Sequence, residues 1–141
     1  MKVLIVEDDL VIADMYSEMI VESGLYTVCC IARTIKEAVQ CAKKHDPDLA
    51  LIDIRLARGE LGTDIPPLLN PRVGILYSTG NVERLHFEGV KGHGCLTKPY
   101  SSNDLMRGLD IISEMITKGK LLLPLPRSFV MLPEGTERLA V

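Results

Sequence analysis

Four short hydrophobic runs in this chain each end at polar residues. The runs are 2–6, followed by Glu7, Asp8 and Asp9; 49–52, followed by Asp53; 73–77, followed by Ser78 and Thr79; and 95–97, followed by Lys98. Short apolar runs bounded by turn residues are typical of buried strands. Because segments with helical spacing separate these runs, the pattern predicts an α/β fold built on a parallel sheet.

Apolar residues at helical spacing, together with capping signals, predict the remaining elements. We expect a further strand at 26–31 and helices at 10–23, 34–45 and 102–118, with a turn or two inside 55–69 and a brief helix at 81–87. Thr34 and Glu37 form the pattern of a capping box, Asp9 is expected to cap the first helix, and Ser101 or Ser102 the last. Glycines and prolines keep any helix inside 55–69 short.

The polar residues at the strand ends have a common chemistry. In open α/β sheets, ligands bind just beyond the carboxyl ends of the strands. If the four runs lie side by side, the carboxylates of Glu7, Asp8 and Asp53 meet the Thr79 hydroxyl and the Lys98 ammonium there. Oxygen-rich clusters of this kind suit a divalent cation, and a fixed cation with a hydroxyl suits a phosphoryl group.

Composition sets broad limits. A chain of 141 residues is enough for one domain, and its net charge of −3 gives no electrostatic reason to expect nucleic acid. No apolar stretch approaches the ~18 residues of a membrane span, and no signal-peptide pattern opens the chain, so we expect no membrane partner and a cytoplasmic protein. The four cysteines form no C-x-x-C or zinc pattern, and we expect them to be reduced and structural.

The ordered series Glu7-Asp8, Asp53, Thr79 and Lys98-Pro99 resembles the receiver domain of two-component response regulators over about residues 1–118. The resemblance implies a flavodoxin-like, doubly wound, five-stranded parallel sheet with strand order 2-1-3-4-5. The stretch from Asp53 to Lys98 is shorter than is usual in the family, so the third and fourth helices are expected to be shortened.

The resemblance also implies a role for each carboxylate at the strand ends. Asp53 is the expected phosphoacceptor. Mg²⁺ is the expected cofactor, held by Asp8 and Asp53, by Glu7 through water, and by the backbone carbonyl of Arg55.

The contacts to the phosphoryl group are likewise implied by the resemblance. They come from Lys98, as the fixed cation, and Thr79, as the hydroxyl donor, with a cis peptide bond expected between Lys98 and Pro99. One position departs from the family, because Cys95 stands where an aromatic switch residue is usual. Tyr77 or Tyr100 is a candidate substitute for that ring.

The segment 119–141 is too short to bury a core of its own and is interpreted as an apolar tail, not a domain. Its prolines exclude a long helix and confine any strand to a sheet edge. We expect it to pack on the last helix and fifth strand, either within one protomer or across a possible homodimer.

The sequence therefore predicts a stand-alone receiver that accepts a phosphoryl group from a histidine kinase or a histidine phosphotransfer protein, and that signals through an unidentified protein partner without being an enzyme. Two alternatives stay open. One is a receiver-like interaction module that works without phosphorylation, favoured by Cys95. The other is a small Mg²⁺-dependent phosphatase, disfavoured because Arg55 stands where a second aspartate would be needed.

Overall fold

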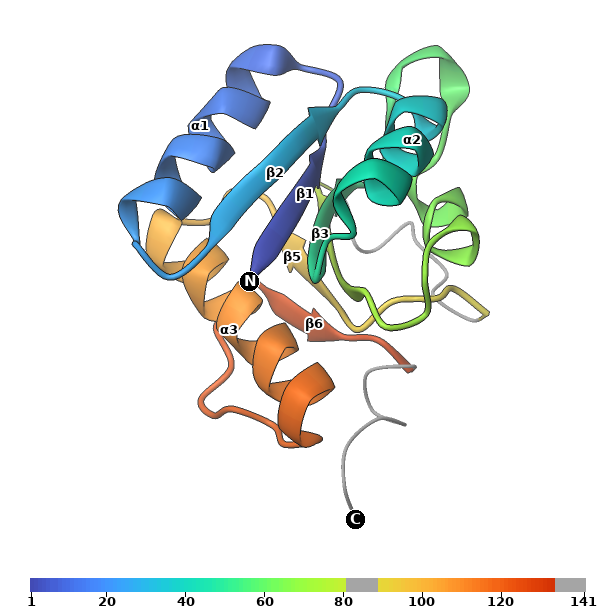
Figure 1. The fold of residues 1–141 in the computed structure, drawn as a ribbon. Helices are drawn as coiled ribbons and strands as arrows, with labels where there is room; N and C mark the ends of the chain where they lie inside the picture. The colour runs from blue at the N-terminus through green and yellow to red at the C-terminus, as the bar shows by residue number, and fades with distance from the viewer. Residues whose placement is uncertain (81–88, 134–141) are drawn as a thin grey trace.

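The computed structural model describes residues 1–80 and 89–133, which form a six-stranded sheet with helices on both faces (Figure 1). The strands are β1 (Lys2–Val6), β2 (Thr27–Ala32), β3 (Leu49–Asp53), β4 (Gly74–Thr79), β5 (Gly94–Thr97) and β6 (Phe129–Met131). The α-helices are α1 (Leu10–Glu22), α2 (Ile35–His45) and α3 (Ser102–Lys118). The helix expected at 81–87 lies outside the described residues.

The strand order is β2-β1-β3-β4-β5-β6, and the first five strands are parallel. The predicted flavodoxin-like order 2-1-3-4-5 is thus confirmed. The predicted number of strands is wrong, because β6 adds an antiparallel edge strand beside β5. Prolines on either side of β6 cannot donate to a ladder, which explains why this short strand lies at the sheet edge.

Alternate residues of the buried strands face two separate hydrophobic layers. Val3 and Ile5 of β1 pack with α1 and α3, whereas Leu4 and Val6 pack on the side of α2. Figure 1 shows α1 and α3 on one side of the sheet and α2 on the other. The central strands are covered on both faces, as expected of continuous apolar runs in a parallel sheet.

The predicted helix caps are confirmed. Asp9 Oδ1 accepts hydrogen bonds from the first turn of α1, at 3.0 Å from the nitrogen of Val11. Thr34 Oγ1 and Ser101 Oγ cap α2 and α3 in the same way, at 3.1 Å in each case. The αL conformation of Gly119, at φ 63°, ends α3.

The connection between β3 and β4 contains three 3₁₀ turns and, in this described stretch, no α-helix. The turns are Ala57–Gly59, Gly62–Asp64 and Pro66–Leu68. This confirms the shortening predicted for the third helix.

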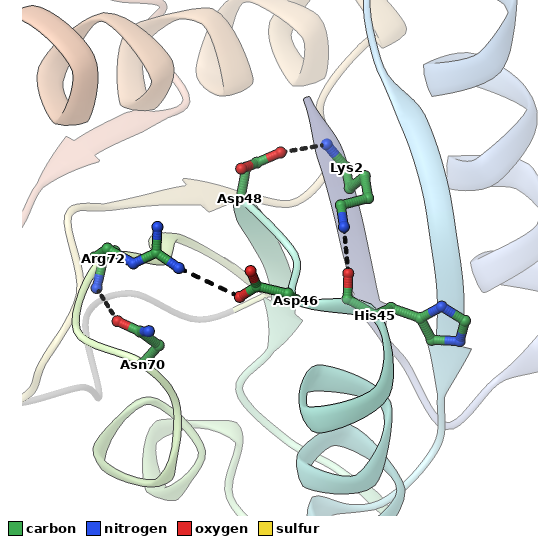
Figure 2. Close-up of polar contacts among 6 residues, drawn as sticks. All are labelled: Lys2, His45, Asp46, Asp48, Asn70 and Arg72. Atoms are coloured by element: carbon green, nitrogen blue, oxygen red, sulfur yellow. Dashed lines mark hydrogen bonds and ion pairs between the residues drawn. The ribbon is translucent and has the colours of Figure 1, made fainter.

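Polar contacts close the end of the sheet where β1 and β3 begin (Figure 2). The backbone nitrogen of Lys2 donates to Asp48 at 2.8 Å, and its ammonium group donates to the carbonyl of His45. Arg72, just before β4, reaches Asp46 at the end of α2 at 3.4 Å. These contacts hold the amino ends of β1 and β3 at the same level. The polar residues that follow the two strands therefore also lie at the same level, at the opposite edge of the sheet.

The described part of the tail packs as predicted against α3 and β5. Arg107 of α3 donates two hydrogen bonds to the carbonyl of Pro124, and Ser128 Oγ bonds Asp104 at 3.0 Å. Leu121, Leu122 and Leu125 join the hydrophobic layer of α1 and α3. All these contacts lie within one chain, so a homodimer stays a prediction.

Two further sequence expectations concern cysteines and membranes. The structure joins Cys30 of β2 to Cys41 of α2 in a disulfide, so the expectation of reduced cysteines is wrong for this pair. Strand and helix bring together residues that no sequence motif links. Within the described ranges, no helix has the length and apolar character needed to span a membrane.

Candidate functional site

The strand register places the predicted site residues at one edge of the sheet. Ile52 of β3 lies beside Val6 of β1, so Glu7 and Asp53 leave neighbouring strands at the same level. Asp53 is in turn the register partner of Ser78, and Thr79 is the last residue of β4. The carboxyl ends of these strands therefore meet, as the sequence predicts.

Glu7, Asp8 and Asp53 form a carboxylate cluster in which one oxygen from each lies within 4.8 Å of the others. Glu7 and Asp53 are only 2% and 9% exposed. Burial, followed by the hydrogen bond and negative charge of Asp53, raises the pKa of Glu7 to about 8. Among the described residues, Glu7 Oε2 has no hydrogen-bond partner. A buried, unpaired oxygen beside two carboxylates fits a hard divalent cation such as Mg²⁺.

Lys98 supplies the positive charge opposite this cluster. Its Nζ atom lies 3.6 Å from Asp53 Oδ1, and the side chain is half-buried. Burial is the largest single influence and lowers the pKa of Lys98, but the nearby negative groups, Asp53 foremost, together outweigh it, so the pKa of Lys98 is raised. The backbone nitrogen of Lys98 donates to the carbonyl of Thr79 at 2.7 Å, and the Lys98-Pro99 bond is cis as predicted.

These groups border a cavity of about 270 Å³. Its lining residues are Asp53, Arg55, Thr79, Gly80 and Lys98. The cavity therefore exposes a carboxylate, a hydroxyl and two cationic side chains to an incoming group. Arg55 is itself exposed, while the role of its carbonyl stays a prediction.

Gly62 is a site residue that sequence reasoning missed. A β-carbon built at this position would overlap the backbone carbonyl oxygen of Asp53 and lie 2.6 Å from Ile52. The nitrogen of Gly62 also donates to the carbonyl of Ile54 at 2.7 Å. In the sequence, this glycine indicates only a helix breaker, because the fold alone brings it against β3.

Of the two candidate substitutes for the missing aromatic ring, Tyr100 lies near the site. Its hydroxyl is 2.8 Å from Ser78 Oγ, and its ring stacks on that of Tyr16. Tyr77 is fully buried, with its hydroxyl bonded to the carbonyl of Lys91, and Cys95 is also buried. Tyr16 has no sequence motif that marks it and was not predicted.

Arg33 also meets the site, without a motif that predicts it. It follows β2, and its Nε donates to the carbonyl of Asp8 at 3.3 Å. The nitrogen of Glu7 donates to the carbonyl of Ala32 at 3.0 Å. The end of β2 therefore holds the backbone of two residues of the carboxylate cluster.

Comparison with known proteins agrees with this arrangement. The family model of the response regulator receiver domain matches residues 3–110. The transcriptional regulatory protein PdtaR of Mycobacterium tuberculosis is 30% identical over 114 residues, covering 78% of this chain and 55% of that protein. The transcriptional regulatory protein CitT of Bacillus subtilis is 28% identical, covering 88% and 56%. The chain thus spans about half the length of these relatives.

Solved structures show the same similarity. The signal receiver domain of a modulated diguanylate cyclase from Desulfovibrio desulfuricans superposes with a TM-score of 0.73 at 28% identity, covering 84% of this chain and 98% of that one. The response regulator PhyR from Brucella abortus gives a TM-score of 0.64 at 31% identity, covering 77% of this chain and 45% of that one.

Proposed function

This chain belongs to the response regulator receiver family, and we propose that it accepts a phosphoryl group on Asp53 from a histidine kinase or a histidine phosphotransfer protein. The observation that carries the proposal is the placement of Asp53 beside Glu7 and Asp8 and 3.6 Å from Lys98, at the wall of a cavity that Thr79 also lines. Receiver domains are signalling domains and in general are not enzymes.

The proposed step is a transfer without redox change. A carboxylate oxygen of Asp53 attacks the phosphorus of a phosphohistidine, the new O–P bond forms, and the N–P bond breaks. The imidazole leaves with the bonding electron pair and takes up a proton. Lys98 attracts the phosphoryl oxygens, and the Thr79 hydroxyl donates a hydrogen bond to one of them.

The carboxylate cluster would hold the metal that this transfer requires. Asp8 and Asp53 are the proposed direct ligands of Mg²⁺, with Glu7 acting through water and the Arg55 carbonyl completing the set. Bound Mg²⁺ would neutralise charge that builds on the transferring phosphoryl group. The chain itself holds three carboxylates so close together that their mutual repulsion favours binding of a cation.

We further propose that the phosphorylated chain is cytoplasmic and acts on a protein partner. Two of its relatives are named transcriptional regulatory proteins, but the net charge of −3 gives no electrostatic reason to expect DNA binding by this chain. A phosphorylation-independent interaction module is the second candidate, favoured by the buried Cys95 at the position of the usual ring.

Intact-mass measurement separates the two candidates. The chain is incubated with Mg²⁺ and acetyl phosphate, beside Asp53→Asn and a sample with excess chelator. We expect one phosphoryl adduct on the wild-type chain and none in the other two samples. An adduct of equal yield on Asp53→Asn would reject the assignment of the acceptor. No adduct on any sample, with a folded wild-type chain, would favour the interaction module.

A further inference from the structure

The pairing of β1 with β2 contains an irregularity at two adjacent cysteines. Val3 pairs with Val28, but Leu4 pairs with Cys30, so Cys29 is an extra residue in β2. In a regular strand, neighbouring side chains point to opposite faces. Here both Cys29 and Cys30 pack with the hydrophobic layer on the α2 side of the sheet. The bulge therefore turns a second cysteine toward α2.

Cys41 of α2 reaches the same place. Its Cα lies 6.6 Å from that of Cys30, inside the range of about 4.4–6.8 Å that a disulfide spans, and the structure joins the two sulfurs. The Cys29 sulfur lies within 4.8 Å of both. We call these three residues the cysteine cluster. All are half-buried, so small oxidants and reductants can reach them.

We propose that Cys30 and Cys41 are a reversible dithiol–disulfide modification site and that Cys29 is a third thiol placed to exchange with it. In compartments where cellular thiols keep cysteines reduced, a protein disulfide is rare unless it is transient or redox-sensing. The cluster combines the two parts of such a site, which are a pair whose Cα atoms lie 6.6 Å apart and an adjacent free thiol. Cys95 takes no part, since β5 and β2 lie at different ends of the parallel strand order.

Hydrogen peroxide is the proposed oxidant of the Cys30–Cys41 pair. One thiolate of the pair attacks hydrogen peroxide, becomes a sulfenic acid and releases hydroxide, which a proton converts to water. The second thiolate attacks that sulfur, the S–S bond forms and the S–O bond breaks, and the departing hydroxide takes up a proton to become a second water. An external dithiol reverses the change, because its first thiolate opens the bond to a mixed disulfide and its second thiol displaces the remaining protein thiolate.

Cys29 has the properties of a thiol that reacts slowly at neutral pH. Its S–H group donates a hydrogen bond to the carbonyl oxygen of Val3 at 3.4 Å. Burial raises the pKa of the Cys29 thiol, so most of it is protonated at neutral pH. Because only the thiolate attacks a disulfide, the Cys30–Cys41 bond persists beside it, and exchange becomes faster as the pH rises.

Thiol counting tests the proposal on the full chain. Samples treated with hydrogen peroxide or with dithiothreitol are unfolded, alkylated with iodoacetamide and weighed intact. We expect four alkylated cysteines after reduction and two after oxidation, with the oxidised pair mapped to Cys30 and Cys41. A second dithiothreitol treatment should restore four. Four alkylated cysteines after peroxide, or oxidation that dithiothreitol does not reverse, would overturn the proposal.

Three variants identify the thiols involved. Cys95→Ser is the matched control and should keep the oxidised pair. Cys29→Ser should also keep the Cys30–Cys41 disulfide. In the wild-type chain we expect a disulfide between Cys29 and Cys41 to accumulate at high pH, and Cys29→Ser cannot form it. Cys41→Ser should show no disulfide between Cys29 and Cys30. Thermal unfolding verifies that each variant is folded. Tight binding of Zn²⁺ by the reduced wild-type cluster, with resistance to peroxide, would overturn the redox assignment in favour of a metal site.

Discussion

The Tyr100 hydroxyl lies 2.8 Å from Ser78 Oγ, which ties the segment after β5 to the residue that pairs with Asp53 in the sheet. The Tyr100 ring stacks on Tyr16 of α1, with centroids 6.0 Å apart. Since Cys95 has no ring, we expect Tyr100, among the aromatic side chains of the described residues, to respond if Asp53 is phosphorylated.

Tyr100→Phe should leave phosphorylation of Asp53 intact but reduce the structural change that follows it. The substitution removes only the hydroxyl, and losing one neutral hydrogen bond costs about 0.5–1.5 kcal/mol of unfolding free energy. Amide NMR spectra with and without acetyl phosphate measure the response. Tyr77→Phe is the matched control, since it removes a hydroxyl bonded to Lys91, and should respond as wild type. Equal responses in all three proteins would exclude Tyr100 from the switch.

Glu7 should make the metal-free chain less stable as the pH rises. Its pKa is raised from 4.5 to about 8, so between these values the folded state keeps a proton that the unfolded state releases. The free energy of unfolding therefore falls across this window and levels off above it. Urea unfolding in chelator at several pH values measures the slope. Glu7→Gln, which cannot ionise, should flatten it, and an unchanged slope in this variant would contradict the assignment.

Mg²⁺ should stabilise the fold, because it offsets the mutual repulsion of the carboxylate cluster. At a concentration of 100 times Kd the gain is about 2.7 kcal/mol, seen as a higher melting temperature. Lys98→Ala should bind Mg²⁺ as well as wild type or better, since a nearby cation is lost. Thr79→Ala should also bind it, and both variants should blunt the response to phosphorylation. Abolished Mg²⁺ binding in either variant would show that these roles are wrong.

Gly62→Ala should disturb the site through the backbone. The added methyl group overlaps the Asp53 carbonyl and the Ile52 side chain, and such overpacking typically costs about 1–3 kcal/mol. Denaturant unfolding gives the change in stability. Gly80→Ala is the control, because among the described residues, apart from its neighbours in the chain, a methyl group at that position would meet no atom within 4 Å. Equal stability of the two variants would contradict the close contact.

The strand ends were predictable because each apolar run stops at a polar residue, and parallel strands bring their ends to one edge. Asp53 and Lys98 are therefore visible in the sequence. Gly62 and Tyr16 are not, because their contacts with the site depend on how loops and helices pack. The bulge at Cys29 could not be predicted from the sequence either, because strand alternation alone would point Cys29 and Cys30 to opposite faces.

The redox state of the cysteine cluster should change Mg²⁺ affinity, if both proposals hold. Cys30 lies two residues before Ala32, whose carbonyl holds the nitrogen of Glu7, and Arg33 then bonds the carbonyl of Asp8. Because the disulfide fastens β2 to α2, reduction should loosen these supports and weaken Mg²⁺ binding by up to about tenfold, or ~1.4 kcal/mol.

Calorimetric titration of the oxidised and reduced chain with Mg²⁺ measures this difference. Cys41→Ser should bind Mg²⁺ like the reduced chain under both conditions, because it cannot form the disulfide. If the oxidised and reduced wild-type chains bind Mg²⁺ with equal affinity, the disulfide does not influence the carboxylate cluster. This conclusion would hold even if thiol counting confirms that the disulfide forms. Absence of Mg²⁺ binding in both states would instead count against the proposed metal site, so the two failures are distinguishable.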